Sequence, residues 1–303
     1  MENKRVLIIV AVFVMLMLMM VYWFVPVNWF DFKNSSRNYN FTIDNSGKIN
    51  SFYENLRFPT TNISYSINQV CDLNKKYDMT RAFEIISNNT ILNFYPAKFN
   101  ESIAITCEDK IIKDESGLFV AGEGGPTKIV VAGDYNVIKK GEILLIKNSD
   151  CPNPNIAVHE LLHVLGFNHS ENSNNIMYPV TKCEQQVSQD IYDKINNLYS
   201  EEPYVDLVIE NVSATMNGKY LDANISIKNM GIIDSDAFKI KIYSDGSLVK
   251  EIDSDPMEIG HGILLRMTNV WVNKLNIDEI EFVLETSQLE SNKENNKVKI
   301  VLE

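Results

Sequence analysis

The chain has 303 residues, of which 22% are charged, with a formal net charge of −12 at pH 7 and a pI near 4.9. This acidity argues against nucleic-acid binding, which requires a basic surface that neutralises phosphates. The length exceeds what a single hydrophobic core usually organises, so two domains are expected.

The amino terminus contains an apolar segment, Val6–Val25, that is long enough to cross about 30 Å of hydrocarbon as a helix. Lys4 and Arg5 precede it and aromatic residues follow it, which predicts a cytoplasmic amino terminus and an extracellular body. The alternative is a cleaved signal peptide, but the bulky residues after the segment offer no small-residue cleavage site. We therefore expect residues 1–27 to be a cytoplasmic stub and a single-pass transmembrane anchor in the cell membrane.

The next segment, residues 28–57, is rich in Asn, Ser and charged residues and has little apolar periodicity. This composition predicts a linker that separates the anchor from the folded body. A short propeptide remnant is the alternative interpretation.

The string HELLHVLGFNH, which begins at His159, is the strongest functional signal in the chain. Residues four apart on a helix share one face, so His159 and His163 can bind the same metal ion. Gly166 permits the positive φ that ends a helix, which allows His169 to add a third nitrogen. The fourth position of a zinc ion then stays open to water, as catalytic zinc sites require. Glu160 is the expected general base.

The histidine count supports this interpretation. Three of the four histidines in the chain occupy these positions, and the fourth is His261. A match to the full pattern by chance is expected in about one chain of this length in ten thousand. One catalytic Zn²⁺ is therefore the predicted cofactor.

These residues resemble the metzincin metallopeptidases, whose signature is HExxHxxGxxH followed by a methionine-containing turn. The chain is most similar to the matrixins, through Ser170, the turn Ile176–Pro179 and the stretch VSQDIYDKINNLY, which resembles the closing helix of that family. Upstream, ISYSI, MTRAFEII and ILNF fall in the family order of strand, helix and strand. The resemblance covers residues 58–200.

The resemblance implies a zincin-like domain with a mixed sheet and an active-site helix. It implies zinc ligands at His159, His163 and His169, with Glu160 as general base and Met177 as a structural floor. No other histidine lies in this domain, so a single zinc is expected and not the additional structural zinc that matrixins usually carry.

Further features of the family have weaker counterparts here. No cysteine precedes Cys71, so latency through a propeptide cysteine is not expected. Calcium sites are not recognisable, although Asp134 and the stretch Gly122–Gly125 offer oxygens. We expect an extended peptide substrate to pair with an edge strand, for which Gly117–Ala121 is the candidate, and residues 180–186 to shape the specificity pocket.

All four cysteines lie in this domain, and an extracellular location favours disulfide bonds. None of them forms a CxxC pair of the kind that binds zinc. Three pairings are possible. We expect Cys71–Cys107 and Cys151–Cys183, because the second bridge joins the segments before and after the active-site helix and stabilises it by about 3 to 4 kcal/mol.

The pattern changes after residue 200 to short alternating strands, which predicts an all-β immunoglobulin-like sandwich over residues 203–303. Turn signals such as Asn217-Gly218 and Asp245-Gly246 separate the strands. No cluster of metal-binding residues is recognisable in this half. It resembles CARDB modules through VDLVIENV, IKNMG and a final SNKENNKVKI. Two roles are weighed equally for this half, a module that binds a surface protein or glycan and a plain stabilising domain. The strands are expected at DLVIENV, LDANISI, FKIKIYS, ILLRMTNVWV, EIEFVLE and KVKIVL.

The sequence therefore predicts a membrane-anchored extracellular zinc endopeptidase that acts on protein or peptide substrates. Two rivals differ in class or substrate. One is a surface adhesion protein with a non-catalytic zincin scaffold, and the intact Glu160 argues against it. The other is a zinc amidase acting on cell-wall or glycan substrates, which the methionine turn makes less favoured.

Overall fold

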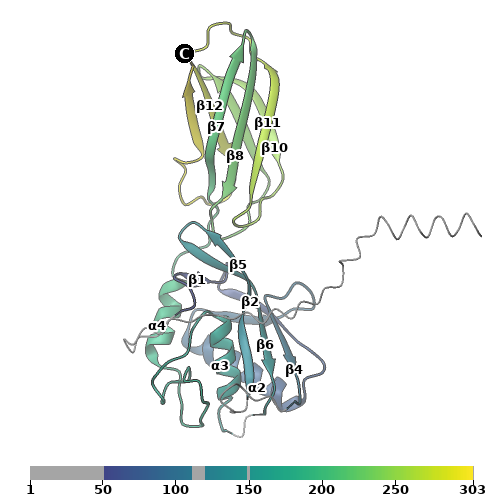
Figure 1. Ribbon diagram of the computed structural model, residues 1–303, viewed down its shortest axis with the longest axis vertical. Coiled ribbons are helices and arrows are strands. Elements are labelled where there is room, and N and C mark those ends of the chain that lie inside the picture. Colours follow the sequence, from purple (N-terminus) through teal and green to yellow (C-terminus); the bar gives the residue numbers. More distant parts are fainter. Residues whose placement is uncertain (1–50, 111–119, 149–150, 303) are drawn as a thin grey trace, which may run out of the picture. The chain divides into compact units, whose positions relative to one another are not determined.

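The computed structural model describes residues 51–110, 120–148 and 151–302 (Figure 1). They belong to one compact unit of the chain, residues 46–303. The predicted anchor and most of the predicted linker lie outside the described residues. Within the described part, no helix is long and apolar enough to cross a membrane. The fold is α+β up to residue 200 and β-rich beyond it, as the sequence predicts.

The first half is built on one six-stranded sheet with the order β1-β6-β4-β2-β3, and β5 pairs with β6. All neighbours on the main path are parallel, whereas β5 is antiparallel to β6. Because β5 pairs with no other described strand, it has a free edge. The strands are β1 (Leu56–Arg57), β2 (Asn62–Ile67), β3 (Asn93–Pro96), β4 (Ile103–Cys107), β5 (Gly122–Ala132) and β6 (Tyr135–Leu145).

Three helices accompany this sheet: α2 (Leu73–Asn89), α3 (Asn155–Val164) and α4 (Gln189–Leu198). Helix α2 begins at Asp72, whose carboxylate accepts a hydrogen bond from Lys75 N at 2.9 Å and so caps the first turn. Every residue of α3 is buried, including the polar residues Asn155, His159, Glu160 and His163. Helix α3 is therefore the central helix of the domain.

The last residues of the predicted linker belong to the folded body. Leu56 and Arg57 form β1, and they are 2% and 0% exposed. Arg57 Nη1 donates to Leu198 O at 2.9 Å, and its guanidinium carbon lies 4.5 Å from the centre of the Tyr199 ring. This arginine ties the start of the domain to the end of α4, where a positive charge is favourable.

Both predicted disulfide bonds are confirmed. Cys71 pairs with Cys107 and Cys151 pairs with Cys183, and no cysteine is free. The first bridge links the start of α2 to the end of β4, and the second links the segments before and after α3. The functional helix is therefore held covalently on both sides of its sequence.

The second half is a seven-stranded sandwich of a four-stranded sheet, β10-β9-β12-β13, and a three-stranded sheet, β11-β8-β7. The sequence prediction misses β10 because its residues are mostly exposed and carry little apolar alternation. The other six predicted strands are present. The strands are β7 (Leu207–Asn217), β8 (Tyr220–Asn229), β9 (Phe238–Ser244), β10 (Ser247–Ser254), β11 (Gly262–Trp271), β12 (Glu279–Glu285) and β13 (Lys297–Val301).

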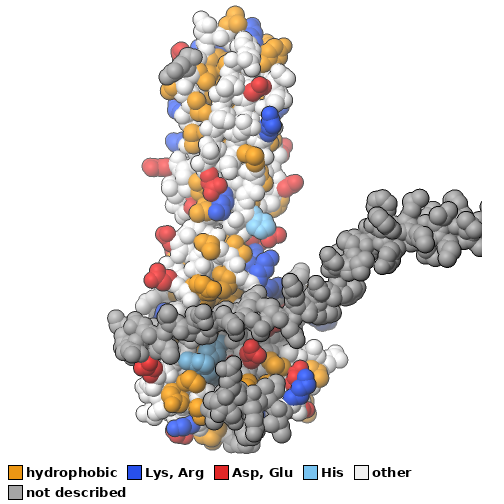
Figure 2. Space-filling view, in the orientation of Figure 1, with side chains coloured by type: hydrophobic (Ala, Val, Ile, Leu, Met, Phe, Trp, Pro, Cys, Tyr) orange, Lys and Arg blue, Asp and Glu red, His pale blue; other side chains and the backbone are white. Residues whose placement is uncertain are grey.

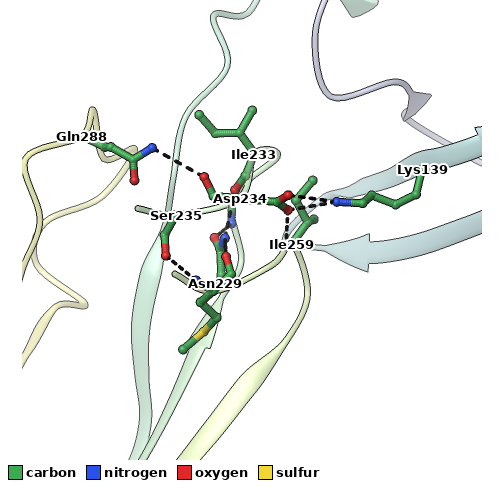
Figure 3. Close-up of polar contacts among 9 residues, drawn as sticks. Lys139, Asn229, Ile233, Asp234, Ser235, Ile259 and Gln288 are labelled. Atoms are coloured by element: carbon green, nitrogen blue, oxygen red, sulfur yellow. Dashed lines mark hydrogen bonds and ion pairs between the residues drawn. The ribbon is translucent and has the colours of Figure 1, made fainter. Parts of the chain in front are cut away.

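The β5–β6 hairpin contacts the sandwich through a small apolar cluster formed by Ala132, Val137, Ile232 and Ile259, each no more than 2% exposed. Beside it, Lys139 Nζ donates to the Asp234 carboxylate at 2.9 Å (Figure 3). The same carboxylate accepts a hydrogen bond from Ile259 N at 2.9 Å. The hairpin that provides the free edge strand is therefore also in contact with the second half.

Candidate metal centre

Two histidines of helix α3 form the base of the site. His159 and His163 lie one turn apart, and their Nε2 atoms are 2.9 Å from each other. Both side chains are buried, with 5% and 7% exposure. The helix therefore presents two ring nitrogens to a single point, as the i, i+4 spacing predicts.

A tight turn after α3 positions the third histidine. Gly166 adopts φ +101°, which non-glycine residues rarely adopt, and a side chain there would also meet Leu56 Cδ2 at 2.8 Å. Phe167 N donates to Leu162 O at 3.0 Å and closes the helix end. After this turn, His169 Nε2 lies 3.3 Å from His159 Nε2 and 3.1 Å from His163 Nε2.

Two backbone carbonyls orient the rings. His159 Nδ1 donates to Ile176 O at 2.7 Å, and His163 Nδ1 donates to Phe167 O at 2.8 Å. Because carbonyl oxygens only accept, each Nδ1 carries the hydrogen and each Nε2 is left with a lone pair. These two carbonyls could not be predicted from the sequence, since the side chains of Ile176 and Phe167 are apolar and only their backbone oxygens take part. Such second partners commonly fix the ring orientation of metal-binding histidines.

The arrangement fits a zinc ion. Tetrahedral zinc bound to nitrogen at about 2.0–2.1 Å separates its ligand atoms by about 3.3–3.4 Å. The three observed separations are 2.9, 3.1 and 3.3 Å. The Nε2 lone pairs of His159 and His163 face each other without a hydrogen between them, so they repel, and a cation removes that repulsion. His159, His163 and His169 are also a group of possible ligands whose atoms all lie within 4.8 Å of one another.

The histidines are held in the neutral form that binds metals. Burial lowers the pKa of His159 to about 4, although its bond to Ile176 O opposes the shift. Burial also lowers the pKa of His163 and of His169. The exposure of His169 sets it apart from its partners and leaves one side of the group open to solvent. Histidine atoms are visible at the surface in the space-filling view (Figure 2).

Glu160 lies beside the first histidine and is 6% exposed. Burial raises the pKa of its carboxyl to about 8, and the negative charge of Glu123 adds to the shift. A side chain at Gly122 would lie 2.8 Å from Glu160 Cγ and 2.9 Å from Glu160 Oε1. A side chain at Gly124 would overlap the Glu160 carbonyl oxygen. The absence of side chains at these two glycines therefore allows β5 to lie against both the carboxyl and the backbone carbonyl of Glu160.

The methionine turn is joined to the site by hydrogen bonds. Met177 is fully buried, and its backbone N donates to Asn175 Oδ1 at 2.8 Å. Met177 O accepts a hydrogen bond from Ser170 N at 2.8 Å. This bond links the turn to the residue that follows His169, and the neighbouring Ile176 supplies the carbonyl that orients His159.

The end of the predicted linker also reaches the site. Phe52 N donates to Gly166 O at 2.9 Å, and the Phe52 ring lies 5.8 Å from the His163 ring. Ser51 forms an isolated antiparallel bridge with Phe167. Residues just before the domain therefore pack against the turn that carries the third histidine.

The expected edge strand lies partly outside the described residues. Residues 117–119 are not described, Val120 and Ala121 are not in a strand, and the described edge strand, β5, begins at Gly122. Asp134 lies in the turn at the far end of β5, nine to twelve residues from Gly122–Gly125, so the oxygens that these two groups offer are separated along the strand. At about 3.3 Å per residue, an extended strand of that length separates its ends widely.

The fold and the site together define the metzincin class, with two histidines on a helix, a glycine turn, a third histidine and a methionine turn. Residues 57–200 match the matrixin family, and residues 204–300 match the CARDB family. The first half of the folded body therefore matches matrixin domains and the second half matches CARDB domains.

Among curated proteins, the zinc metalloproteinase nas-22 of Caenorhabditis elegans is 27% identical over 132 residues. The match covers 43% of this chain and 29% of the nas-22 chain, so this chain spans less than a third of its relative.

Two solved structures contain the CARDB domain of one Pyrococcus furiosus protein. Its crystal structure in complex with di-metal ions is 18% identical and covers 32% of this chain and 85% of its own, with a TM-score of 0.28. Its solution structure is also 18% identical and covers 33% of this chain and 94% of its own, with a TM-score of 0.29. In both cases about a third of this chain matches most of the solved domain.

Proposed function

We propose that this chain is a zinc-dependent endopeptidase. The observation that carries the proposal is the convergence of three histidine Nε2 atoms beside the buried carboxyl of Glu160. The matrixin match and the similarity to a zinc metalloproteinase support it. His159, His163 and His169 hold the zinc, and no other described residue is needed as a protein ligand.

When bound there, zinc lowers the pKa of water to about 7 and polarises a peptide carbonyl. The chain supplies the orientation. Ile176 O and Phe167 O fix the two helical imidazoles, so their lone pairs stay directed at one point through the reaction. The exposed side of His169 leaves room for water and substrate.

Glu160 moves the proton. Its carboxylate accepts a proton from the attacking water and then returns it to the nitrogen of the leaving amine. Burial, together with the negative charge of Glu123, raises the pKa of this carboxyl to about 8, and a nearby cation lowers it. The two effects oppose each other and bring the group toward neutral pH, where proton transfer in both directions is efficient.

Strand β5 provides the binding edge for the substrate. Its free edge can accept an extended peptide as an added strand. Gly122 and Gly124 place that strand directly against Glu160, so a peptide bond aligned beside them is near the carboxyl. The specificity segment, residues 180–186, is held in place because Asn155 Nδ2 donates to Lys182 O at 2.7 Å and Gln185 Nε2 donates to Val180 O at 2.9 Å.

We also propose that the apolar segment Val6–Val25 anchors the enzyme with its folded body outside the cell. The support is the composition of that segment and the two disulfide bonds, which are typical of oxidising compartments. Protease added to intact cells should remove the folded body, and a body that resists protease until the cells are lysed would contradict this orientation.

The test of the enzymatic proposal compares the full chain with Glu160→Gln, using Glu171→Gln as the matched control because Glu171 is an exposed carboxylate near His169. The parent and the control are expected to bind one zinc per chain and to cleave members of a mixed peptide library. Glu160→Gln is expected to keep the zinc and to lose about 100-fold or more of the cleavage rate.

Full cleavage by Glu160→Gln would exclude the proposed general base. Zinc binding without peptide cleavage in the parent would favour the adhesion alternative. Cleavage of amide bonds in cell-wall glycopeptides, with no cleavage of ordinary peptides, would favour the zinc amidase.

A further inference from the structure

Three buried oxygen atoms that lie close together in the sequence of the CARDB domain lack a hydrogen-bond partner: Glu290 Oε1, Asn295 Oδ1 and Asn296 Oδ1. A fourth, Ser244 Oγ, belongs to strand β9. Glu290 and Asn296 are 8% and 6% exposed, so both side chains are more than nine-tenths buried. Each unpaired buried acceptor costs about 1–3 kcal/mol. Three of them in neighbouring residues indicate that something other than the protein satisfies them.

The side chains that carry these atoms converge on one place. Glu290 Oε2 accepts a hydrogen bond from Leu207 N at 3.1 Å, and Asn295 Nδ2 donates to Asp206 Oδ1 at 2.9 Å. Leu207 directly follows Asp206, so both bonds reach the same two residues. Burial raises the pKa of the Glu290 carboxyl, the Asp206 charge adds to the shift, and a hydrogen bond with the Asn296 side chain opposes it. Glu290 is therefore linked to both Asp206 and Asn296, and Asp206 is linked in turn to Asn295.

The backbone around these residues is fixed by the sandwich. Ile209 N donates to Asn295 O at 3.1 Å, and Leu284 N donates to Asn296 O at 2.8 Å. Val205 also forms an isolated parallel bridge with Glu290. The oxygens are consequently held in place before any ligand arrives, which reduces the entropy lost on binding.

The candidate occupants of the site are a water molecule and a cation. All three free atoms accept hydrogen bonds, whereas one water molecule donates only two hydrogens and a protonated Glu290 supplies only one. A cation has no such limit, and carboxylate and amide oxygens are the ligands that calcium prefers. Two carboxylates, Asp206 and Glu290, also match the charge of a divalent ion. Lys293 is the positive group that acts on Glu290, but its side chain is exposed.

We propose that Asp206, Glu290, Asn295 and Asn296 form a calcium-binding site in the CARDB domain. The ion joins the residue before β7 to the loop before β13, which are far apart in the sequence. Water molecules complete its coordination, since calcium takes six to eight oxygen ligands. Two carboxylates are few for a tight site, so the affinity is expected in the range of extracellular modules, a Kd of about 10⁻⁴ to 10⁻³ M.

The experiment titrates calcium chloride into the zinc-loaded full chain by calorimetry and follows the thermal midpoint in parallel. The histidine centre does not compete, because calcium prefers oxygen ligands. The variants are Glu290→Gln, Asp206→Asn and Asn296→Asp, with Glu294→Gln as the matched control, since Glu294 is an exposed carboxylate of the same loop. Circular dichroism verifies that each variant is folded.

One calcium per chain and a midpoint raised by a few degrees are expected in the parent and in Glu294→Gln. Glu290→Gln and Asp206→Asn should weaken binding at least tenfold, whereas Asn296→Asp should strengthen it by adding a carboxylate. The proposal is overturned if the parent shows neither heat nor a shifted midpoint at about 10 mM calcium, well above the expected Kd. It is also overturned if folded Glu290→Gln and Asp206→Asn bind calcium as the parent does. Should either variant not fold, unchanged affinity in Asn296→Asp is the result that overturns it.

Discussion

The histidine centre and the oxygen cluster of the CARDB domain are assembled in opposite ways. His159 and His169 are ten residues apart, and one helix with its following turn brings them together. Asn295 and Asp206 are 89 residues apart, and only the pairing of segments within the sandwich brings them together. A site built by one helix is visible as a motif, whereas a site built by strand pairing is scattered through the sequence.

The two sites also differ in what surrounds them. The histidine centre lies on a buried helix flanked by a disulfide bond, and its ring orientations depend on two carbonyls. The oxygen cluster has no covalent bridge, because the CARDB domain contains no cysteine, and it is held by backbone and side-chain hydrogen bonds. Removing each of these features in turn measures how strongly it controls its own site.

The largest effect is expected from His163→Ala. This change removes one of three converging nitrogens. Loss of a group that only orients a metal ligand already lowers metal affinity by up to about 100-fold, so loss of the ligand itself should lower zinc affinity by more than that. Equilibrium dialysis with metal analysis measures the affinity. His261→Ala is the control, since His261 is the exposed fourth histidine and lies in the CARDB domain. Equal zinc affinity in both variants would refute the assignment of the centre.

A second prediction concerns the disulfide that flanks α3. The double variant Cys151→Ser/Cys183→Ser opens a loop with a sequence separation of 32 and should lower the free energy of unfolding by about 3 to 4 kcal/mol. Denaturant titration measures this loss. The control is Cys71→Ser/Cys107→Ser, with a separation of 36, which should cost a similar amount and leave zinc affinity closer to that of the parent. Unchanged stability in both double variants would show that the bridges do not constrain the unfolded chain.

A third, smaller effect is expected from the buried carboxyl in the absence of zinc. The pKa of Glu160 is about 8 in the folded state and near 4.5 in the unfolded state, so the folded state binds the proton more tightly. The resulting stability is complete below pH 4.5 and is lost as the pH rises through 8. Glu160→Gln removes this loss, and the zinc-free variant should exceed the zinc-free parent by roughly 2 to 3 kcal/mol at pH 9.

Denaturant titrations of the two zinc-free proteins at pH 5 and pH 9 provide the measurement. Little difference is expected at pH 5, where the parent carboxyl is protonated in the folded state. Glu171→Gln is the control at both pH values because its carboxylate is exposed. A stability difference that does not grow with pH would show that the environment of Glu160 does not penalise its charge.

The sequence by itself determined the features that depend on short-range spacing. The i, i+4 histidines, the glycine with positive φ and the methionine turn predicted the centre, because a helix and its end are set by neighbouring residues. The same reasoning predicted both disulfide pairs and six of the seven sandwich strands. It missed β10, whose mostly exposed residues give little apolar alternation, and it placed the start of the edge strand before Gly122.

Only the tertiary structure decided which distant groups meet. It placed the carbonyls of Ile176 and Phe167 behind the histidine rings, brought Gly122 against Glu160, and packed Phe52 of the predicted linker beside His163. It also joined Asp206 to Asn295 across the sandwich. Backbone carbonyls, glycines and amide side chains carry no distinctive sequence pattern, and their partners are set by strand register and helix packing. Apart from the Phe167 carbonyl, which is four residues from His163, those contacts join different segments of the chain, where local propensity has no influence.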